Sequence, residues 1–295
     1  MVKDWPVISD FSRLHYLPDP FPEPVPLQLY LKRDDELHPT ISGNKWRKLK
    51  YNLAEARRLG YQTLLTYGGA YSNHIYAVAA AGSEYGFSTI GIIRGEDHRE
   101  RDNPTLAFAR AQGMHLHFVT RQQFRNRSDA VFQQDIRQRF GTFYELPEGG
   151  TNELAIRGTA EIIPEILTQL EGEIPDFVCC PVGTGGTLAG LEKTAPPGVK
   201  ILGFSSLKGY NSEPNSRAQV LTEYHFGGYA KTTPALIAFI RDFEKKNQVR
   251  LEQVYTGKML FGIFDLARKG VFLSDTKVVA IHTGGLQGRS EKLDC

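Results

Sequence analysis

The sequence feature that most constrains the fold is a recurring order in which a short apolar run is followed by a longer stretch of helical pattern. The runs with strand character are Thr63–Tyr67, Thr89–Ile93, Leu116–Val119, Phe177–Val182, Ile201–Ser205 and Val278–His282, with Leu27–Lys32 ahead of them. The helical stretches are Arg47–Leu59, Ile75–Tyr85, Pro104–Gln112, Ala130–Phe140, Leu154–Leu170, Pro234–Lys246 and Lys258–Arg268. This alternation predicts βαβ units and parallel sheets, which is an α/β fold.

Several of these predicted strands end directly in glycine. The glycines are Gly68-Gly69, Gly183 and Gly284-Gly285. Open α/β sheets bind their ligands outside the carboxyl ends of the strands. We therefore expect the functional site where these glycines lie.

Charge and hydropathy exclude two classes of partner. The 295 residues carry 35 Lys and Arg against 33 Asp and Glu, a net charge of +2, and this balance predicts no nucleic-acid partner. No apolar run approaches the roughly 20 residues of a spanning helix, so we expect no membrane segment. The first residues also lack an apolar run of signal-peptide length, which favours a cytosolic location.

Cysteine and histidine usage predicts neither a disulfide nor a metal site. Cys179 and Cys180 are adjacent in a predicted strand, so their side chains point to opposite faces and are expected in the core. The third cysteine, Cys295, ends the chain. The histidines show no spacing typical of zinc ligands, and we predict no metal.

The strongest local motif is the glycine-rich segment from Gly183 to Gly190, which follows an apolar strand and precedes a predicted helix. Glycines allow close backbone approach to an anion, and the N–H groups of a helix N-terminus favour phosphate. The segment lacks the Lys-Ser/Thr of a Walker loop, and Leu188 replaces the third glycine of a dinucleotide motif. A site for a single phosphate fits best; a tight turn without a ligand is the alternative.

Two residues stand out as candidates for chemistry. Lys45, in Ser-Gly-Asn-Lys, would be an ordinary surface charge unless a phosphate site faces it. A phosphate-anchored aldehyde needs an amine nucleophile, which a desolvated lysine supplies. Ser72 precedes an alanine-rich helix and is expected to be its N-cap, a carboxylate ligand, or both.

Several motifs in one order carry a resemblance to a known family. They are Lys32-Arg33-Asp34-Asp35, Ser42-Gly43-Asn44-Lys45, Ser72-Asn73-His74, Gly95-Glu96, the glycine-rich segment, Val254-Tyr255-Thr256-Gly257-Lys258 and His282-Thr283-Gly284-Gly285. Between about residues 31 and 288 the chain resembles the D-cysteine desulfhydrase and 1-aminocyclopropane-1-carboxylate deaminase family. These are fold type II, tryptophan synthase β-like enzymes that use pyridoxal 5′-phosphate.

The resemblance implies a two-domain α/β fold with open, parallel-rich twisted sheets flanked by helices. A smaller domain, residues 48–152, would be inserted into a larger one formed by residues 1–47 and 153–295. Pyridoxal phosphate would lie in the cleft between the domains. The family usually forms homodimers and acts on a small amino acid, so both are expected of this chain.

Site roles follow by the same resemblance. Lys45 corresponds to the Schiff-base lysine and Asn73 to the partner of the phenolic oxygen of the cofactor. The phosphate cup is implied to comprise Gly183, Thr184, Gly185, Gly186 and Thr187. Ser72 is implied to meet the substrate carboxylate, beside the amides of Asn73 and His74. Tyr229 and Tyr255 fall where the family keeps two catalytic tyrosines.

Two positions divide the branches of this family. The cyclopropane deaminases have Glu after the second tyrosine and Leu before the late Gly-Gly, whereas this chain has Thr256 and Thr283. A glutamate at the pyridine nitrogen strengthens the electron sink, and β-elimination of a thiolate does not require that help. We therefore expect Thr283 to contact the nitrogen, with Thr256 beside it.

The predicted reaction is β-elimination from D-cysteine or a similar β-substituted amino acid to pyruvate, ammonia and sulfide. Three alternatives remain: deamination of 1-aminocyclopropane-1-carboxylate, a pyridoxal-phosphate-binding protein with little catalysis, and a different phosphate ligand. Tyr71 and Tyr76 differ from many relatives, and the region from Lys208 to Tyr229 is shorter. These departures leave the preferred substrate open.

Overall fold

The structure is a computed structural model that describes residues 11–23, 25, 27–98, 103–211 and 216–294. Cys295, the first ten residues and part of the shortened region after Lys208 lie outside these ranges. The chain divides into two compact units, and one boundary falls between Asn44 and Lys45. Of the described residues, those between 45 and 155 belong to the small unit, and those in 11–44 and 156–294 belong to the large unit.

Six strands form the sheet of the large unit within its described residues, in the order β1-β2-β10-β7-β8-β9. The neighbours β1 and β2 are antiparallel, and the remaining neighbours are parallel. The strands are β1 (Leu14–Leu17), β2 (Leu27–Lys32), β7 (Phe177–Val182), β8 (Lys200–Ser205), β9 (Gln219–Leu221) and β10 (Thr276–Ile281).

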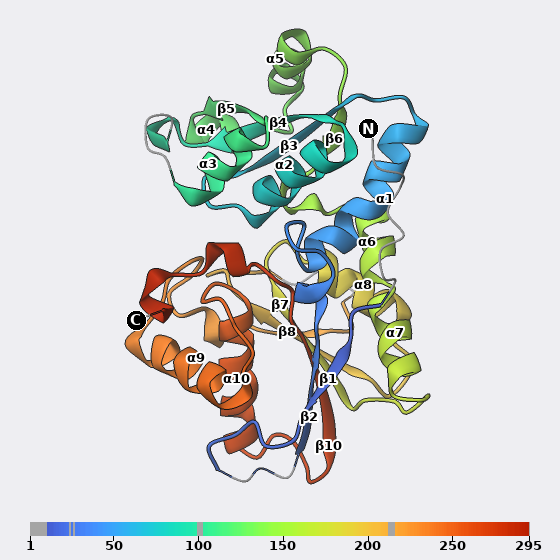
Figure 1. Ribbon diagram of the computed structural model, residues 1–295, viewed down its shortest axis with the longest axis vertical. Helices are drawn as coiled ribbons and strands as arrows, with labels where there is room; N and C mark the ends of the chain where they lie inside the picture. The colour runs from blue at the N-terminus through green and yellow to red at the C-terminus, as the bar shows by residue number, and fades with distance from the viewer. Residues whose placement is uncertain (1–10, 24, 26, 99–102, 212–215, 295) are drawn as a thin grey trace. The chain divides into compact units, whose positions relative to one another are not determined.

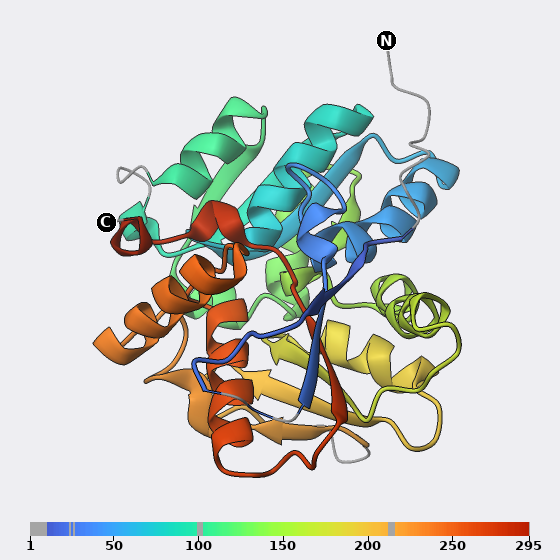
Figure 2. The same ribbon diagram turned by 60° about the horizontal axis from the view of Figure 1, so that its bottom comes forward.

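Helices cover both faces of this sheet, as Figures 1 and 2 show from two directions. One apolar core joins Cys179 to α9 (Pro234–Asn247) and α10 (Thr256–Arg268), and another joins Cys180 to α7 (Ile162–Gln169) and α8 (Gly186–Thr194). Because side chains alternate along a strand, the two adjacent cysteines enter different cores, as predicted. Both are fully buried, and burial raises the pKa of the Cys179 thiol well above its ordinary value.

The small unit contains, in its described residues, a four-stranded parallel sheet in the order β5-β4-β3-β6. Its strands are β3 (Thr63–Gly69), β4 (Ser88–Arg94), β5 (His115–Val119) and β6 (Tyr144–Leu146). Its helices are α1 (Asn44–Arg58), α2 (Asn73–Tyr85), α3 (Pro104–Ala111), α4 (Arg121–Arg125) and α5 (Ala130–Phe140). Helix α2 lies against β3 and β4 and packs beside α3 (Figure 1).

Each sheet has a point where the order of its strands reverses. In the large unit the chain proceeds from β7 to β8 and β9, and β10 then returns to the other side of β7. In the small unit β4 and β5 lie on one side of β3 and β6 on the other. Ligands of open α/β sheets bind at such reversals, beyond the carboxyl ends of the strands. The segments found there are 183–187 and 282–285 in the large unit, and 70–74 and 147–151 in the small unit.

The predicted α/β class, with parallel-rich sheets and flanking helices, is confirmed. Several local predictions were wrong or incomplete. The stretch Leu154–Leu170 is two helices, α6 (Glu153–Thr159) and α7, separated at Ala160 and Glu161. The short strands β1, β6 and β9 and the five-residue helix α4 were not predicted, because three to five residues carry too little periodicity to be recognised.

Candidate active site

Lys45 is the second residue of α1 and the first described residue of the small unit. Burial of its amine lowers the pKa of Lys45 from 10.5 to about 8. The residue keeps some exposed surface, and its side chain makes no hydrogen bond or ion pair with any part of the chain that the structure describes. An amine with a lowered pKa and no partner is suited to attack an aldehyde.

Two buried lysines on α1 and α10 have their amines occupied. The Nζ of Lys48 donates to the carbonyl of Gly149 at 3.0 Å and to Thr151 Oγ1 at 3.2 Å. The Nζ of Lys258 donates to two carbonyls, those of His225 and Gly228, both at 2.9 Å. Burial lowers the pKa of Lys258 to about 8 as well. The hydrogen-bond partners, and not the pKa, therefore distinguish Lys45.

The turn before Lys45 contacts Thr283 and Thr187, two residues of the large unit that are predicted to bind the cofactor. Gly43 has a φ of +66°, and a Cβ there would lie 1.9 Å from the carbonyl oxygen of Thr283. The backbone N–H of Asn44 donates to that same oxygen at 3.3 Å. The Asn44 side chain donates from Nδ2 to Thr187 Oγ1 at 2.9 Å. Sequence reasoning missed Asn44, whose only signal was its place directly before the lysine.

The predicted phosphate cup joins β7 to α8. Gly185 adopts a φ of +79° just before the first turn of α8, whose N–H groups lack helical partners and favour an anion. Thr187 is buried and Thr184 is exposed. A Cβ at Gly183 would lie 3.3 Å from the ring of Tyr255, so the loop passes close to one predicted catalytic tyrosine. These features fit a single phosphate.

Ser72 is the N-cap of α2. Its Oγ accepts hydrogen bonds from the backbone N–H of His74 at 3.2 Å and of Ile75 at 3.3 Å. The helix-cap interpretation is therefore correct, and the serine proton stays available for a carboxylate. The amide of His74, implied to meet the substrate, is already used by this cap. Asn73 starts the helix beside it and is half-buried.

The His74 ring is buried, and both of its nitrogens lack a hydrogen-bond partner among the described residues. Burial, together with the positive charges of Lys45 and Lys48, lowers the pKa of His74 well below 6.5. The ring is therefore neutral at physiological pH. Gly150 makes room for it, since a Cβ there would lie 2.7 Å from His74 Cε1.

Tyr229 and Tyr255 lie together in the large unit. Their ring centroids are 6.1 Å apart with an interplanar angle of 67°. Tyr229 is 39% exposed and follows the turn whose carbonyls, at His225 and Gly228, bind the Lys258 amine. The two predicted catalytic tyrosines thus form one edge-to-face pair.

The two branch-specific threonines differ in what their hydroxyls contact. The Thr256 hydroxyl lies 3.2 Å from the backbone nitrogen of Glu252 and 3.1 Å from its Oε1. Glu252 also accepts the N–H groups of residues 254–256, and burial raises its pKa. In the described part of the chain the Thr283 hydroxyl has no partner. This contrast favours Thr283 over Thr256 for a contact with the cofactor; both assignments stay predictions.

No three His, Cys, Asp or Glu side chains of the described residues gather as metal ligands would. Among those residues, no helix is both long enough and apolar enough to cross a membrane.

The fold and the lysine site define a class of enzyme, and comparison with known families agrees. Residues 13–284 match the family described as "Pyridoxal-phosphate dependent enzyme", and the chain belongs to it. The cofactor is pyridoxal phosphate, and the site residues described above fit it.

Individual relatives have names that are more specific than the family description. A mitochondrial protein of Arabidopsis thaliana named bifunctional D-cysteine desulfhydrase/1-aminocyclopropane-1-carboxylate deaminase is 28% identical, over 98% of this chain and 81% of its own length. A D-cysteine desulfhydrase of Klebsiella pneumoniae is 26% identical over 92% of this chain and 90% of its own. The crystal structure of an ACC deaminase homologue superposes with a TM-score of 0.80 at 27% identity, covering 94% of this chain and 90% of that one.

Proposed function

We propose that this enzyme catalyses β-elimination from D-cysteine or a similar β-substituted small amino acid, releasing pyruvate, ammonia and sulfide. The observation that carries the proposal is the Lys45 amine, which has a pKa of about 8 and no partner among the residues that the structure describes. Its turn is hydrogen-bonded to Thr187 of the phosphate cup and to the carbonyl of Thr283. An anchored phosphate and a free amine on linked segments are what an aldehyde cofactor needs.

The reaction requires a bound cofactor, a held carboxylate and a base. Pyridoxal phosphate supplies an aldehyde for the amines and a ring that accepts the electrons left at Cα. Lys45 would hold the cofactor, and its amine, once freed, would take the Cα proton. Ser72, at the N-terminus of α2, binds the carboxylate. Tyr255 or Tyr229 assists the departing sulfur.

The choice of substrate rests on the two branch positions. A hydroxyl at Thr283 or Thr256 does not enforce protonation of the pyridine nitrogen, as a glutamate would. Thiolate is a fair leaving group, so a weaker electron sink suffices for D-cysteine. The Arabidopsis relative is named for both activities, and 1-aminocyclopropane-1-carboxylate is therefore the second candidate substrate.

Three further features are proposed, the first two from the family resemblance. Residues 48–152 act as a domain inserted between residues 1–47 and 153–295. The enzyme is a homodimer, so sedimentation is expected to give about twice the chain mass of 33.1 kDa. It works in the cytosol, which cell fractionation can test.

The test of function is 2-oxo acid release by cofactor-loaded protein offered D-cysteine, L-cysteine or 1-aminocyclopropane-1-carboxylate in parallel. We expect turnover of D-cysteine, and Lys45→Ala is the inactive control. Turnover of the cyclopropane alone would mean that Thr256 and Thr283 do not decide the chemistry. Protein that is yellow yet inactive on all three would contradict the proposed substrate and leave cofactor binding intact.

A further inference from the structure

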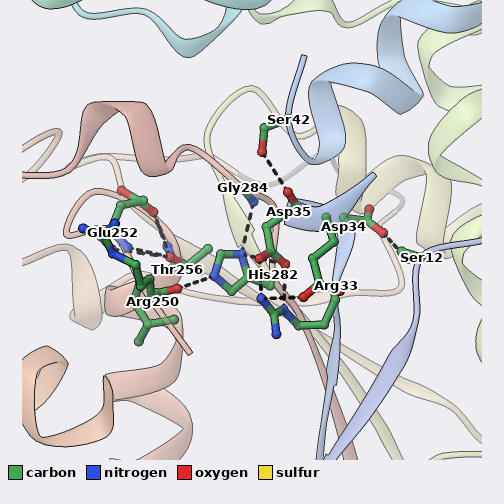
Figure 3. A network of polar contacts seen from close by, with 12 residues as sticks. Ser12, Arg33, Asp34, Asp35, Ser42, Arg250, Glu252, Thr256, His282 and Gly284 are labelled. Carbon is green, nitrogen blue, oxygen red and sulfur yellow. Dashed lines mark hydrogen bonds and ion pairs between the residues drawn. The ribbon is translucent and has the colours of Figure 1, made fainter. Parts of the chain in front are cut away.

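His282 lies where three segments of the large unit meet (Figure 3). It follows β10 directly, and its side chain is 1% exposed. The first segment, before α10, reaches the ring through the Arg250 carbonyl, 2.7 Å from Nε2. The second is the turn 283–285, whose Gly284 N–H lies 3.3 Å from Nδ1. The third is the segment 33–35, whose Asp35 Oδ1 lies 3.4 Å from Nδ1.

These partners determine which ring nitrogen carries the proton. A carbonyl oxygen only accepts hydrogen bonds, so Nε2 of His282 must donate to Arg250. A backbone N–H only donates, so Nδ1 must be bare to accept from Gly284. The neutral ring with its proton on Nε2 satisfies both contacts. Asp35 does not need a proton from His282, because Arg33 donates to its two carboxylate oxygens at 2.9 and 2.6 Å.

Asp35 extends the network to the turn that precedes Lys45. Its backbone N–H donates to the His282 carbonyl at 3.0 Å, and its own carbonyl accepts from Ser42 Oγ at 3.4 Å. Ser42 in turn touches Gly284, where a Cβ would lie 2.5 Å from the serine oxygen. Asp35, in the charged motif 32–35 that had no assigned role, therefore contacts both His282 and Ser42.

We propose that His282 and Asp35 are positioning residues that hold three cofactor-contacting segments in fixed positions relative to one another. The His282 ring joins the segment that leads to Tyr255 and Thr256 to the turn that carries Thr283. Asp35 joins that turn to the one that carries Lys45. The inference rests on the proposed function, because it takes these segments to be those that contact pyridoxal phosphate.

The test measures binding of pyridoxal phosphate to apoprotein, from absorbance and circular dichroism of the bound cofactor, beside thermal unfolding of the apoprotein. His282→Ala removes both ring contacts. We expect the Kd to rise roughly 10- to 100-fold, the range seen when residues that orient ligand-binding groups are removed, and the cofactor dichroism to change. His282→Asn keeps an acceptor near the Nδ1 position for Gly284, and its Kd is expected between wild type and His282→Ala.

The matched control is Glu165→Gln. Glu165 lies on α7 and pairs with Lys32 at 2.7 Å, and both side chains are almost fully buried. We expect this variant to lower the unfolding temperature while the Kd stays within about threefold. If the His282 variants do not fold, Ser42→Ala replaces them, because it removes the hydroxyl that donates to the Asp35 carbonyl and is expected to raise the Kd in the same direction.

Two results would overturn the proposal. One is wild-type affinity and dichroism in His282→Ala, or in Ser42→Ala where that variant replaces it. The other is equal weakening in Glu165→Gln, which would assign the effect to general destabilisation. Since the assay measures cofactor binding and not turnover, failure of the D-cysteine assignment would leave this test unaffected.

Discussion

At the scale of single residues, the amines of Lys45, Lys48 and Lys258 differ in their hydrogen-bond partners. The amines of Lys48 and Lys258 each donate to two acceptors, whereas the amine of Lys45 has none in the described chain. Both Lys45 and Lys258 have a pKa lowered to about 8 by burial. A lysine held by two carbonyls stabilises a turn, and a lysine without partners can react.

The pKa of Lys45 predicts how cofactor capture depends on pH. Only the neutral amine attacks an aldehyde, and a pKa lowered from 10.5 to about 8 makes that form abundant at lower pH. The rate of pyridoxal phosphate capture by apoprotein should rise about tenfold per pH unit up to about 8 and level off above it. Stopped-flow absorbance measures this rate, with a lysine peptide in the same buffers as control. A rate that keeps rising toward pH 10.5 would show an unperturbed amine.

Ser72 caps α2, and we predict that it also binds the substrate carboxylate; these two roles can be separated. Ser72→Ala should cost about 1 kcal/mol of unfolding free energy through the lost cap, and lower kcat/KM on the order of 100-fold because the carboxylate is misplaced. Asn103→Ala is the control, because Asn103 caps α3 by accepting from two backbone N–H groups in the same way. Equal kinetics in the two variants would reduce Ser72 to a helix cap.

The sequence identified the residues that carry a recognisable motif, such as Lys45 and Ser72. It assigned no role to Asn44, Glu252 or His282, although the last two are deeply buried and hydrogen-bonded. Their contacts join positions far apart in the chain, for example Asn44 with Thr187. No local pattern predicts such pairings, so the residues that support the site needed the fold.

At the scale of elements, the close approach of two turns is the feature that positions Lys45. Gly43 leaves no space for a side chain beside the Thr283 carbonyl. The turn that precedes α1 and the turn that follows β10 therefore depend on each other. A change in one should displace the other.

Gly43→Ala tests this dependence. The new Cβ would lie 1.9 Å from the Thr283 oxygen, so we expect the turn to shift and pyridoxal phosphate affinity to fall at least about 10-fold. Gly60→Ala is the control: Gly60 also has a positive φ, of +78°, but a Cβ there meets nothing within 4 Å. Both variants should lose about 1 kcal/mol of stability from backbone strain, and only Gly43→Ala should lose affinity. Equal affinities would show that the turns move independently.

Elements with strong periodicity were predictable, and short ones were not. The strands β3, β4, β5, β7, β8 and β10 coincide with apolar runs that the sequence shows directly. The edge strands β1 and β9 are short, with four and three residues, and they form by pairing with a longer neighbour rather than by their own pattern. The interruption at Ala160 and Glu161 likewise divides a stretch whose composition is continuous.

At the scale of the whole molecule, each unit places its candidate residues at the reversal of its own sheet. The large unit has the predicted phosphate cup and the 282–285 turn beyond β7 and β10, and the small unit has Ser72 beyond β3. Such placement is a property of open α/β sheets, so the parallel order read from the sequence already indicated it. The strand order itself came only from the structure.

The most direct test of the central claim is to reduce the cofactor-loaded enzyme with borohydride and map the modified peptide by mass spectrometry. Reduction fixes the cofactor to the lysine that holds it. We predict one modified lysine, Lys45, and no modification in Lys45→Ala. Modification of Lys258, which shares the pKa of about 8, or of any other lysine would contradict the account and place the cofactor elsewhere.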